Sequence, residues 1–203
     1  GGTAGDAVTT GNDNTAIGFG ALTAEDTGQK NTAIGSYALT SLDYNGDGHN
    51  TAVGFNAGLN VSTGIQNTLM GSLAGDALTT GSKNVAIGIA ALSTEDGDDY
   101  STAVGAYALE SQNTGADAHN TAVGYFAGNA ISTGVKNTTI GSQAGDAINT
   151  GENNIIIGYA AAASAVDVDN EITLGDANIS AFRCADQSIA ALSDGRDKSE
   201  VEE

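Results

Sequence analysis

The chain has 203 residues, of which 29 are Gly, 5% are aromatic and none is Trp or Pro. Its formal net charge of −19 excludes nucleic acid as an expected partner, because phosphate neutralisation needs a basic surface. The lack of proline excludes a collagen-like or polyproline chain, and the single cysteine excludes an intrachain disulfide framework. No signal peptide or membrane span is recognisable, so we expect no membrane insertion.

A short phrase, NTAIG or a close variant, recurs ten times along the chain. The steps from one copy of its glycine to the next are 17, 19, 17, 17, 17, 17, 19, 17 and 17, so the pattern 17, 19, 17, 17 sums to 70 and then starts again. A fixed period this short is typical of a solenoid, in which each unit buries its apolar face against the next. The glycines are Gly18, Gly35, Gly54, Gly71, Gly88, Gly105, Gly124, Gly141, Gly158 and Gly175.

One unit, residues 14–30, indicates how each coil is built. Its first five residues alternate with the period of a strand and place Thr15 and Ile17 on one face. A second apolar stretch at 21–22 predicts a second strand in the opposite wall, joined through turns rich in Asp, Asn, Thr and Gly. Helix is disfavoured because no continuous stripe with the helical period exists. The prediction is an all-β parallel β-roll or β-helix of about ten coils.

The residue that opens each strand is asparagine in eight of the ten units. Stacked coils would place these residues in one column, in which each amide bonds to the next and holds the strands in register. We interpret the column as structural. Its members are Asn14, Asn31, Asn50, Asn67, Asn84, Asn120, Asn137 and Asn154, with Ser101 and Glu171 as exceptions.

One turn resembles the first half of a calcium loop. Asp43, Asn45 and Asp47 fit D-x-N-x-D-G, but the twelfth position, which needs a bidentate Glu, is Gly54. The equivalent turn at 113–118 does not keep the ligands. We therefore interpret the turn as Asx-rich and structural and expect no cofactor, with calcium at these three residues as the alternative.

No enzyme motif stands out from the repeating background of Asp and Ser. The sequence holds no P-loop, no CxxC and no recognisable Ser/His/Asp arrangement, so we expect no enzyme. Acids paired between neighbouring coils or chains would escape this reasoning, which keeps a polysaccharide-cleaving site as an alternative.

The periodicity ends after Gly175, and a different kind of sequence follows. The segment 172–198 resembles the junction in bacteriophage tail fibres and tailspikes that carry an endosialidase-type intramolecular chaperone, and 192–198 matches its L-S-D-x-R-x-K string. The resemblance implies a repeat array over 1–176, a junction over 177–192 and the start of a truncated chaperone domain over 193–203. It also implies self-cleavage, with Ser193 as the cleavage serine and Lys198 as its activating lysine. A polar turn capping a helix is the alternative interpretation.

The repeats themselves are similar to those of such phage fibres and, more loosely, to the heads of trimeric autotransporter adhesins. Both resemblances imply a homotrimeric rod. The expected function is therefore a structural attachment protein of the virion tail, which presents a surface to a host glycan or protein receptor and contacts other tail proteins. The alternatives are a trimeric adhesin of the bacterial cell surface and a polysaccharide depolymerase tailspike.

Overall fold

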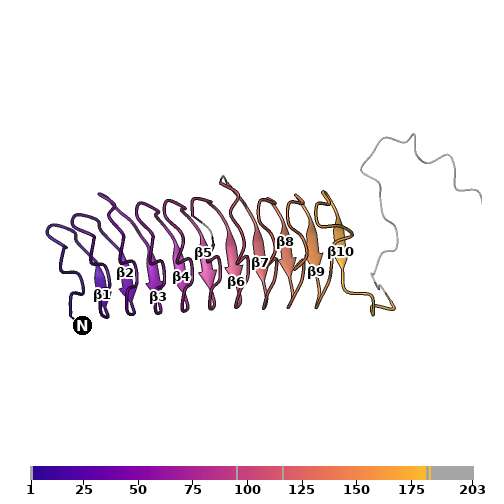
Figure 1. Ribbon diagram of the computed structural model, residues 1–203, viewed down its shortest axis with the longest axis horizontal. Helices are drawn as coiled ribbons and strands as arrows, with labels where there is room; N and C mark the ends of the chain where they lie inside the picture. The colour runs from indigo at the N-terminus through magenta and orange to yellow at the C-terminus, as the bar shows by residue number, and fades with distance from the viewer. Residues whose placement is uncertain (1, 95, 116, 182, 184–203) are drawn as a thin grey trace, which may run out of the picture.

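The computed structural model describes residues 2–94, 96–115, 117–181 and 183, and the repeats wind into one straight solenoid (Figure 1). Within these residues, ten strands form one parallel sheet in the order β1 to β10, so the predicted all-β solenoid is confirmed. The strands are β1 (Thr15–Ile17), β2 (Thr32–Ile34), β3 (Thr51–Val53), β4 (Thr68–Met70), β5 (Val85–Ile87), β6 (Thr102–Val104), β7 (Thr121–Val123), β8 (Thr138–Ile140), β9 (Ile155–Ile157) and β10 (Ile172–Leu174).

Each strand ends just before the glycine that marks the period, and the geometry requires glycine there. Gly35 and Gly105 have φ values of 139° and 138°, which L side chains rarely adopt. A Cβ at either position would lie 2.2 Å from the carbonyl oxygen of the next glycine along the stack. The coils therefore stack through direct backbone contact at this corner.

The wall opposite the sheet is a series of turns rather than the predicted second strand. Leu22 and Leu39 have φ values of 54° and 48°, in the left-handed region, so the backbone cannot extend there. Hydrogen bonds still join the coils along this wall, as between Leu22 N–H and the Ala38 carbonyl at 3.0 Å. The sequence pattern located the wall correctly but not its conformation.

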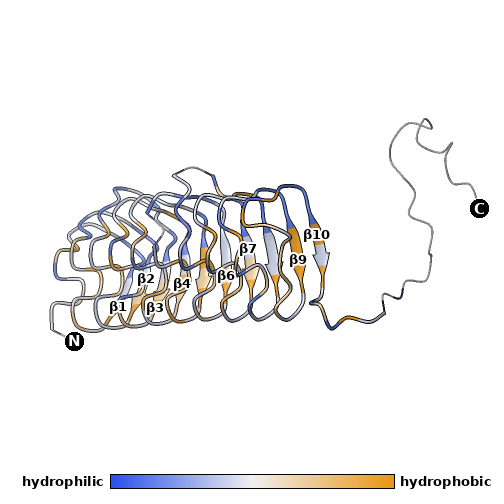
Figure 2. Cartoon of the chain, turned by 45° about the vertical axis from the view of Figure 1, so that its right-hand side comes forward, coloured by the Kyte–Doolittle hydropathy of each residue, from blue (hydrophilic) through white to orange (hydrophobic). Residues whose placement is uncertain are grey.

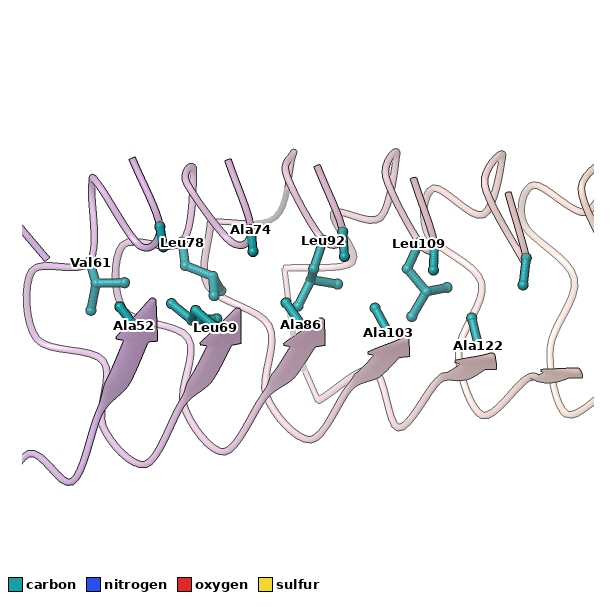
Figure 3. Packing of buried hydrophobic residues seen from close by; sticks show 14 of the residues in the cluster. Ala52, Val61, Leu69, Ala74, Leu78, Ala86, Leu92, Ala103, Leu109 and Ala122 are labelled. Carbon is teal, nitrogen blue, oxygen red and sulfur yellow. The ribbon is translucent and has the colours of Figure 1, made fainter. Parts of the chain in front are cut away.

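A thin core of Ala, Leu, Val and Ile fills the space between the two walls (Figure 3). The middle residue of each strand from β2 to β9 is buried and faces this core. Bulk on one wall is matched by glycine on the other: a Cβ at Gly58 would lie 2.7 Å from Leu69 Cδ1. Volume is thus conserved from coil to coil although the residues that supply it change.

The two longer coils keep the same strand register as the shorter ones. Thr32 of β2 pairs with Thr51 of β3 across a longer coil, just as Thr15 pairs with Thr32 across a shorter one. The additional length is accommodated in the turns, and the sheet continues without interruption. The same holds between β6 and β7, where Thr102 pairs with Thr121.

Candidate functional site

The asparagine column forms as predicted, and its side chains hold successive coils together. The Oδ1 atom of each asparagine accepts a hydrogen bond from the backbone N–H of the next column member, as from Asn84 N to Asn67 Oδ1 at 2.9 Å. Ser101 and Glu171 join the same ladder, each donating its N–H at 2.8 Å to the asparagine before it. All column asparagines except Asn14 are buried.

The pattern of bonds differs from the predicted chain of amide-to-amide contacts. In most coils the Nδ2 group donates to a backbone carbonyl near the end of the same coil, as from Asn84 to Asp98 at 2.8 Å and from Asn137 to Gly151 at 2.7 Å. Two direct amide contacts exist, from Asn50 to Asn31 at 3.3 Å and from Asn154 to Asn137 at 3.0 Å. Most of these amides therefore tie a strand start both to its neighbour and to the end of its own coil, whereas Asn31 Nδ2 donates to the Gln29 carbonyl at 3.1 Å.

At Ser101, one of the two column members that are not asparagine, a glutamine from the core supplies the amide. Gln112 is fully buried, and its Nε2 group donates to Ser101 Oγ at 2.8 Å. Its Oε1 atom accepts from Asn120 Nδ2 at 2.9 Å. The equivalent residues of the first longer coil are Asn31 and Leu42, so the amide lies in the ladder there and in the core here. Sequence reasoning missed Gln112.

The two aspartates of the candidate calcium turn take part in different interactions. Asp47 pairs with Lys30 at 2.6 Å, which holds the pKa of this carboxyl below its usual value, and it lies 3.8 Å from His49 Nε2. Asp43 instead groups with Glu25 and Asp26, whose ligand atoms all lie within 4.8 Å of one another. Calcium at Asp43, Asn45 and Asp47 stays a prediction.

Glu25 is a buried carboxylate that the sequence analysis did not single out. It occupies a position where other coils place Leu42, Val61 or Leu78 in the core. It accepts from the backbone N–H groups of Gly28 and of Tyr44, the latter at 3.4 Å. Buried carboxylates are tolerated where backbone donors satisfy them, so its geometry is that of a structural acceptor.

The residue just before the ladder is long or aromatic in most coils and always has a left-handed backbone. Beside the second longer coil, Tyr100 stacks on His119 with ring centroids 4.9 Å apart, and Lys83 Nζ lies 2.8 Å from the Tyr100 hydroxyl. Bonding to this hydroxyl raises the pKa of Lys83. At the equivalent place beside the first longer coil the contact is the Lys30–Asp47 ion pair.

The sheet side of the coils carries no charged residue over the first nine strands. The ladder residue and the eight residues after it form nine segments, none of which contains Asp, Glu, Lys, Arg or His. All 25 acidic and 6 basic residues of the chain lie elsewhere. The segments are 14–22, 31–39, 50–58, 67–75, 84–92, 101–109, 120–128, 137–145 and 154–162.

Two columns of this side project apolar side chains that the single chain leaves accessible. The third residue of every strand is aliphatic or Met, and Met70 and Ile140 are 42% and 39% exposed. Two positions further on, bulky and small residues alternate from coil to coil. This second column reads Phe19, Ser36, Phe55, Ser72, Ile89, Ala106, Tyr125, Ser142 and Tyr159. Figure 2 shows β9 as apolar along its length. We call the two columns together the strand face.

An open hollow of about 540 Å³ lies at the last coils and is lined by residues of 160–178. Among the described residues that line it, Asp176 is the one ionisable side chain. Ser193 and Lys198, the predicted cleavage residues, lie outside the described residues. Within the described part of the chain, no helix has the length and apolarity needed to cross a bilayer.

Comparison of the chain with models of protein families, with curated proteins and with solved structures gives no match.

Proposed function

We propose that the chain is the shaft of a homotrimeric attachment protein, the distal segment of a phage tail fibre that presents a host receptor-binding surface. The observation that carries the proposal is the strand face, which runs over nine successive coils without a charge in a chain of net charge −19. A long apolar surface on a soluble protein usually marks an interaction site. Three copies of one slender rod can cover such a surface by closed symmetry.

The core supports a role in assembly over a role as a free monomer. Its buried side chains are mainly Ala, with one or two larger residues in each coil. Solenoid coils gain stability only from their neighbours, and a core this thin leaves little reserve in one chain. Packing against two further copies would add buried apolar area along the whole rod.

Maturation by a C-terminal chaperone belongs to the same proposal and rests on the resemblance of 192–198. A serine hydroxyl beside a lysine amine can act as a nucleophile on an adjacent peptide bond. Release of the chaperone would make trimer assembly kinetically one-way, because the rod could no longer refold easily once opened.

Immunogold labelling tests the place of the protein. Antibodies raised against the purified rod should label the ends of tail fibres on phage particles from the source culture. Label on the bacterial envelope in the absence of particles would overturn the proposal in favour of a surface adhesin. Release of sugars from purified host capsule by the rod would instead support a depolymerase.

Mass spectrometry tests the maturation step. When the chain is expressed joined to a full C-terminal chaperone domain, we expect one cut at the Ser193–Asp194 junction. Ser193→Ala and Lys198→Ala should each leave the product intact. A Ser193→Ala product that is still cut at this junction is incompatible with the step.

A further inference from the structure

We infer that the strand face is the surface on which copies of this chain pack against one another, with the bulky residues that follow alternate strands as its anchors. The inference rests on the proposed trimeric rod and names the part of the coil that forms its interior. The turn wall, which carries the charges, then remains on the outside.

The face is long enough for an extended contact between copies. The three residues of a strand span about 10 Å at roughly 3.4 Å per residue, and the nine coils that carry both columns span about 43 Å at roughly 4.8 Å per coil. The strand residues alone therefore cover about 430 Å², about half of what one partner buries in a standard protein interface, and the exposed anchor side chains add to this area.

The distribution of charge favours a second copy over a partner of different chemistry. The turns carry almost all the charge of the array, with 18 acidic and three Lys residues between residues 1 and 175. Two copies facing each other through their turns would repel, whereas two strand faces meet without any charge to desolvate. The face also offers no cation for an acidic ligand to pair with.

The alternation of bulky and small side chains makes the face uneven, with projections separated by gaps. The aromatic side chains of this column are largely exposed in the single chain: 52% for Phe55, 52% for Tyr125 and 68% for Tyr159. The fold of the single chain does not require an aromatic residue at these exposed positions. Ser72 and Ser142 leave gaps in the column, each between bulky residues that lie two coils, or about 9.6 Å, apart. Rigid aromatic anchors separated by small residues are typical of surfaces that interlock with a partner.

A charge placed on the strand face tests the inference, with the same charge on the turn wall as a matched control. Met70→Glu and Val123→Glu introduce a carboxylate at exposed outward positions of β4 and β7, and Thr63→Glu introduces it at an exposed turn position. Ser72→Phe fills a gap, and Phe55→Ala removes an anchor. Mass photometry over a dilution series measures the trimer in each variant, and circular dichroism measures folding.

We expect the parent and Thr63→Glu to be trimeric at the same concentrations. Met70→Glu and Val123→Glu should raise the dissociation concentration at least about tenfold, because each buries unpaired charges in the trimer. Ser72→Phe and Phe55→Ala should raise it less. If separated chains also unfold, the same ranking will appear in the concentration dependence of Tm.

Two outcomes separate the inference from the proposed function. A trimer that withstands both Glu substitutions as well as it withstands Thr63→Glu overturns the strand face as the contact surface, and leaves the trimeric rod standing. A parent chain that is monomeric at micromolar concentration overturns the trimer and the inference together.

Discussion

The two longer coils, 31–49 and 101–119, occupy equivalent positions of the four-coil repeat and solve one structural problem with different residues. The first has Asn31 in the ladder and Leu42 in the core, and the second has Ser101 in the ladder and Gln112 in the core. In both coils a buried amide oxygen accepts a hydrogen bond from the Nδ2 group of the next asparagine. Asn31 Oδ1 accepts from Asn50 at 3.3 Å, and Gln112 Oε1 accepts from Asn120 at 2.9 Å. What the fold preserves is the satisfied hydrogen bond and the filled volume rather than the residue at a given position.

The two longer coils also differ in which buried carboxylate of the preceding coil accepts a hydrogen bond from their backbone. Glu25 accepts from Tyr44 N–H beside the first longer coil. Asp98 is fully buried beside the second and accepts from Thr114 N–H, the equivalent donor, at 2.6 Å. Residue 28, the equivalent of Asp98, is glycine, and a Cβ there would clash with the Glu25 carboxylate. A glutamate at position 25 and an aspartate at position 98 can therefore serve the same purpose, because each carboxylate accepts from the equivalent backbone N–H of the next coil.

The largest effect should come from a feature that the two coils share. Gly35→Ala and Gly105→Ala each force a Cβ to within 2.2 Å of a backbone oxygen, and each needs a strained backbone. We expect both to destabilise the chain by more than about 4 kcal/mol or to prevent folding. Gly97→Ala is the control, because the nearest atom to its Cβ would be Thr80 Oγ1 at 3.2 Å. Urea unfolding of the three variants checks the prediction, and equal midpoints would contradict the stacking argument.

The comparison can be sharpened by moving the amide of the second longer coil from core position 112 to ladder position 101. Gln112→Leu leaves the Ser101 hydroxyl without its glutamine partner, and should cost about 1–3 kcal/mol. Adding Ser101→Asn recreates the first coil, so the double variant should recover most of this loss. A double-mutant cycle measured by denaturant unfolding should give a favourable coupling of about 0.5–3 kcal/mol. Additive effects would show that the two positions act independently.

A graded effect along the ladder should be similar in size to that of Gln112→Leu or smaller. Asn84 is buried and its Oδ1 bonds Ser101 N–H, so Asn84→Ala should cost about 1–3 kcal/mol. Asn14 is only half-buried at the first strand, so Asn14→Ala should cost less. Melting temperatures of both variants and the parent test the ranking. Identical values in all three would remove the ladder from the account of stability.

The smallest effect concerns the Lys30–Asp47 pair, which Tyr100 and Asp117 replace in the second longer coil. Because the pair lowers the pKa of Asp47, its contribution is complete above the ordinary pKa and is lost as the pH falls through the lowered one. The Tm difference between the parent and Asp47→Asn should therefore be small and should vanish in acid. Carboxyl NMR should show that Lys30→Met returns the pKa of Asp47 toward its ordinary value. An unchanged pKa in Lys30→Met would contradict the pairing.

Sequence reasoning located the strands and the ladder because both repeat with the period of the coil. It could not give the conformation of the second wall, since Leu22 and Leu39 look like strand residues and only their left-handed backbone makes a turn. It missed Gln112 because a lone core amide has no pattern within one coil. The available signal was a paired change, in which positions 101 and 112 both differ from 31 and 42.

The candidate interface was visible in the sequence only in part. The alternation within NTAIG showed two uncharged strand faces, but not which of them the chain itself covers. The structure buries the face of Ala33 and Ala52 and leaves the other accessible. The size alternation from Phe19 to Tyr159 becomes meaningful only when the bulky residues are known to be exposed and to lie in one column.

The coil stacking has a consequence for how such a gene can change. Asn14, Asn84 and Asn154 occupy equivalent points of successive four-coil repeats, and each coil bonds mainly to the coils beside it. Recombination between two of these points would remove or add four whole coils and leave every remaining hydrogen bond with an equivalent partner. The rod would become shorter or longer by about 19 Å at roughly 4.8 Å per coil. Unequal crossing-over can therefore change the length of the rod in fixed steps while the fold stays the same.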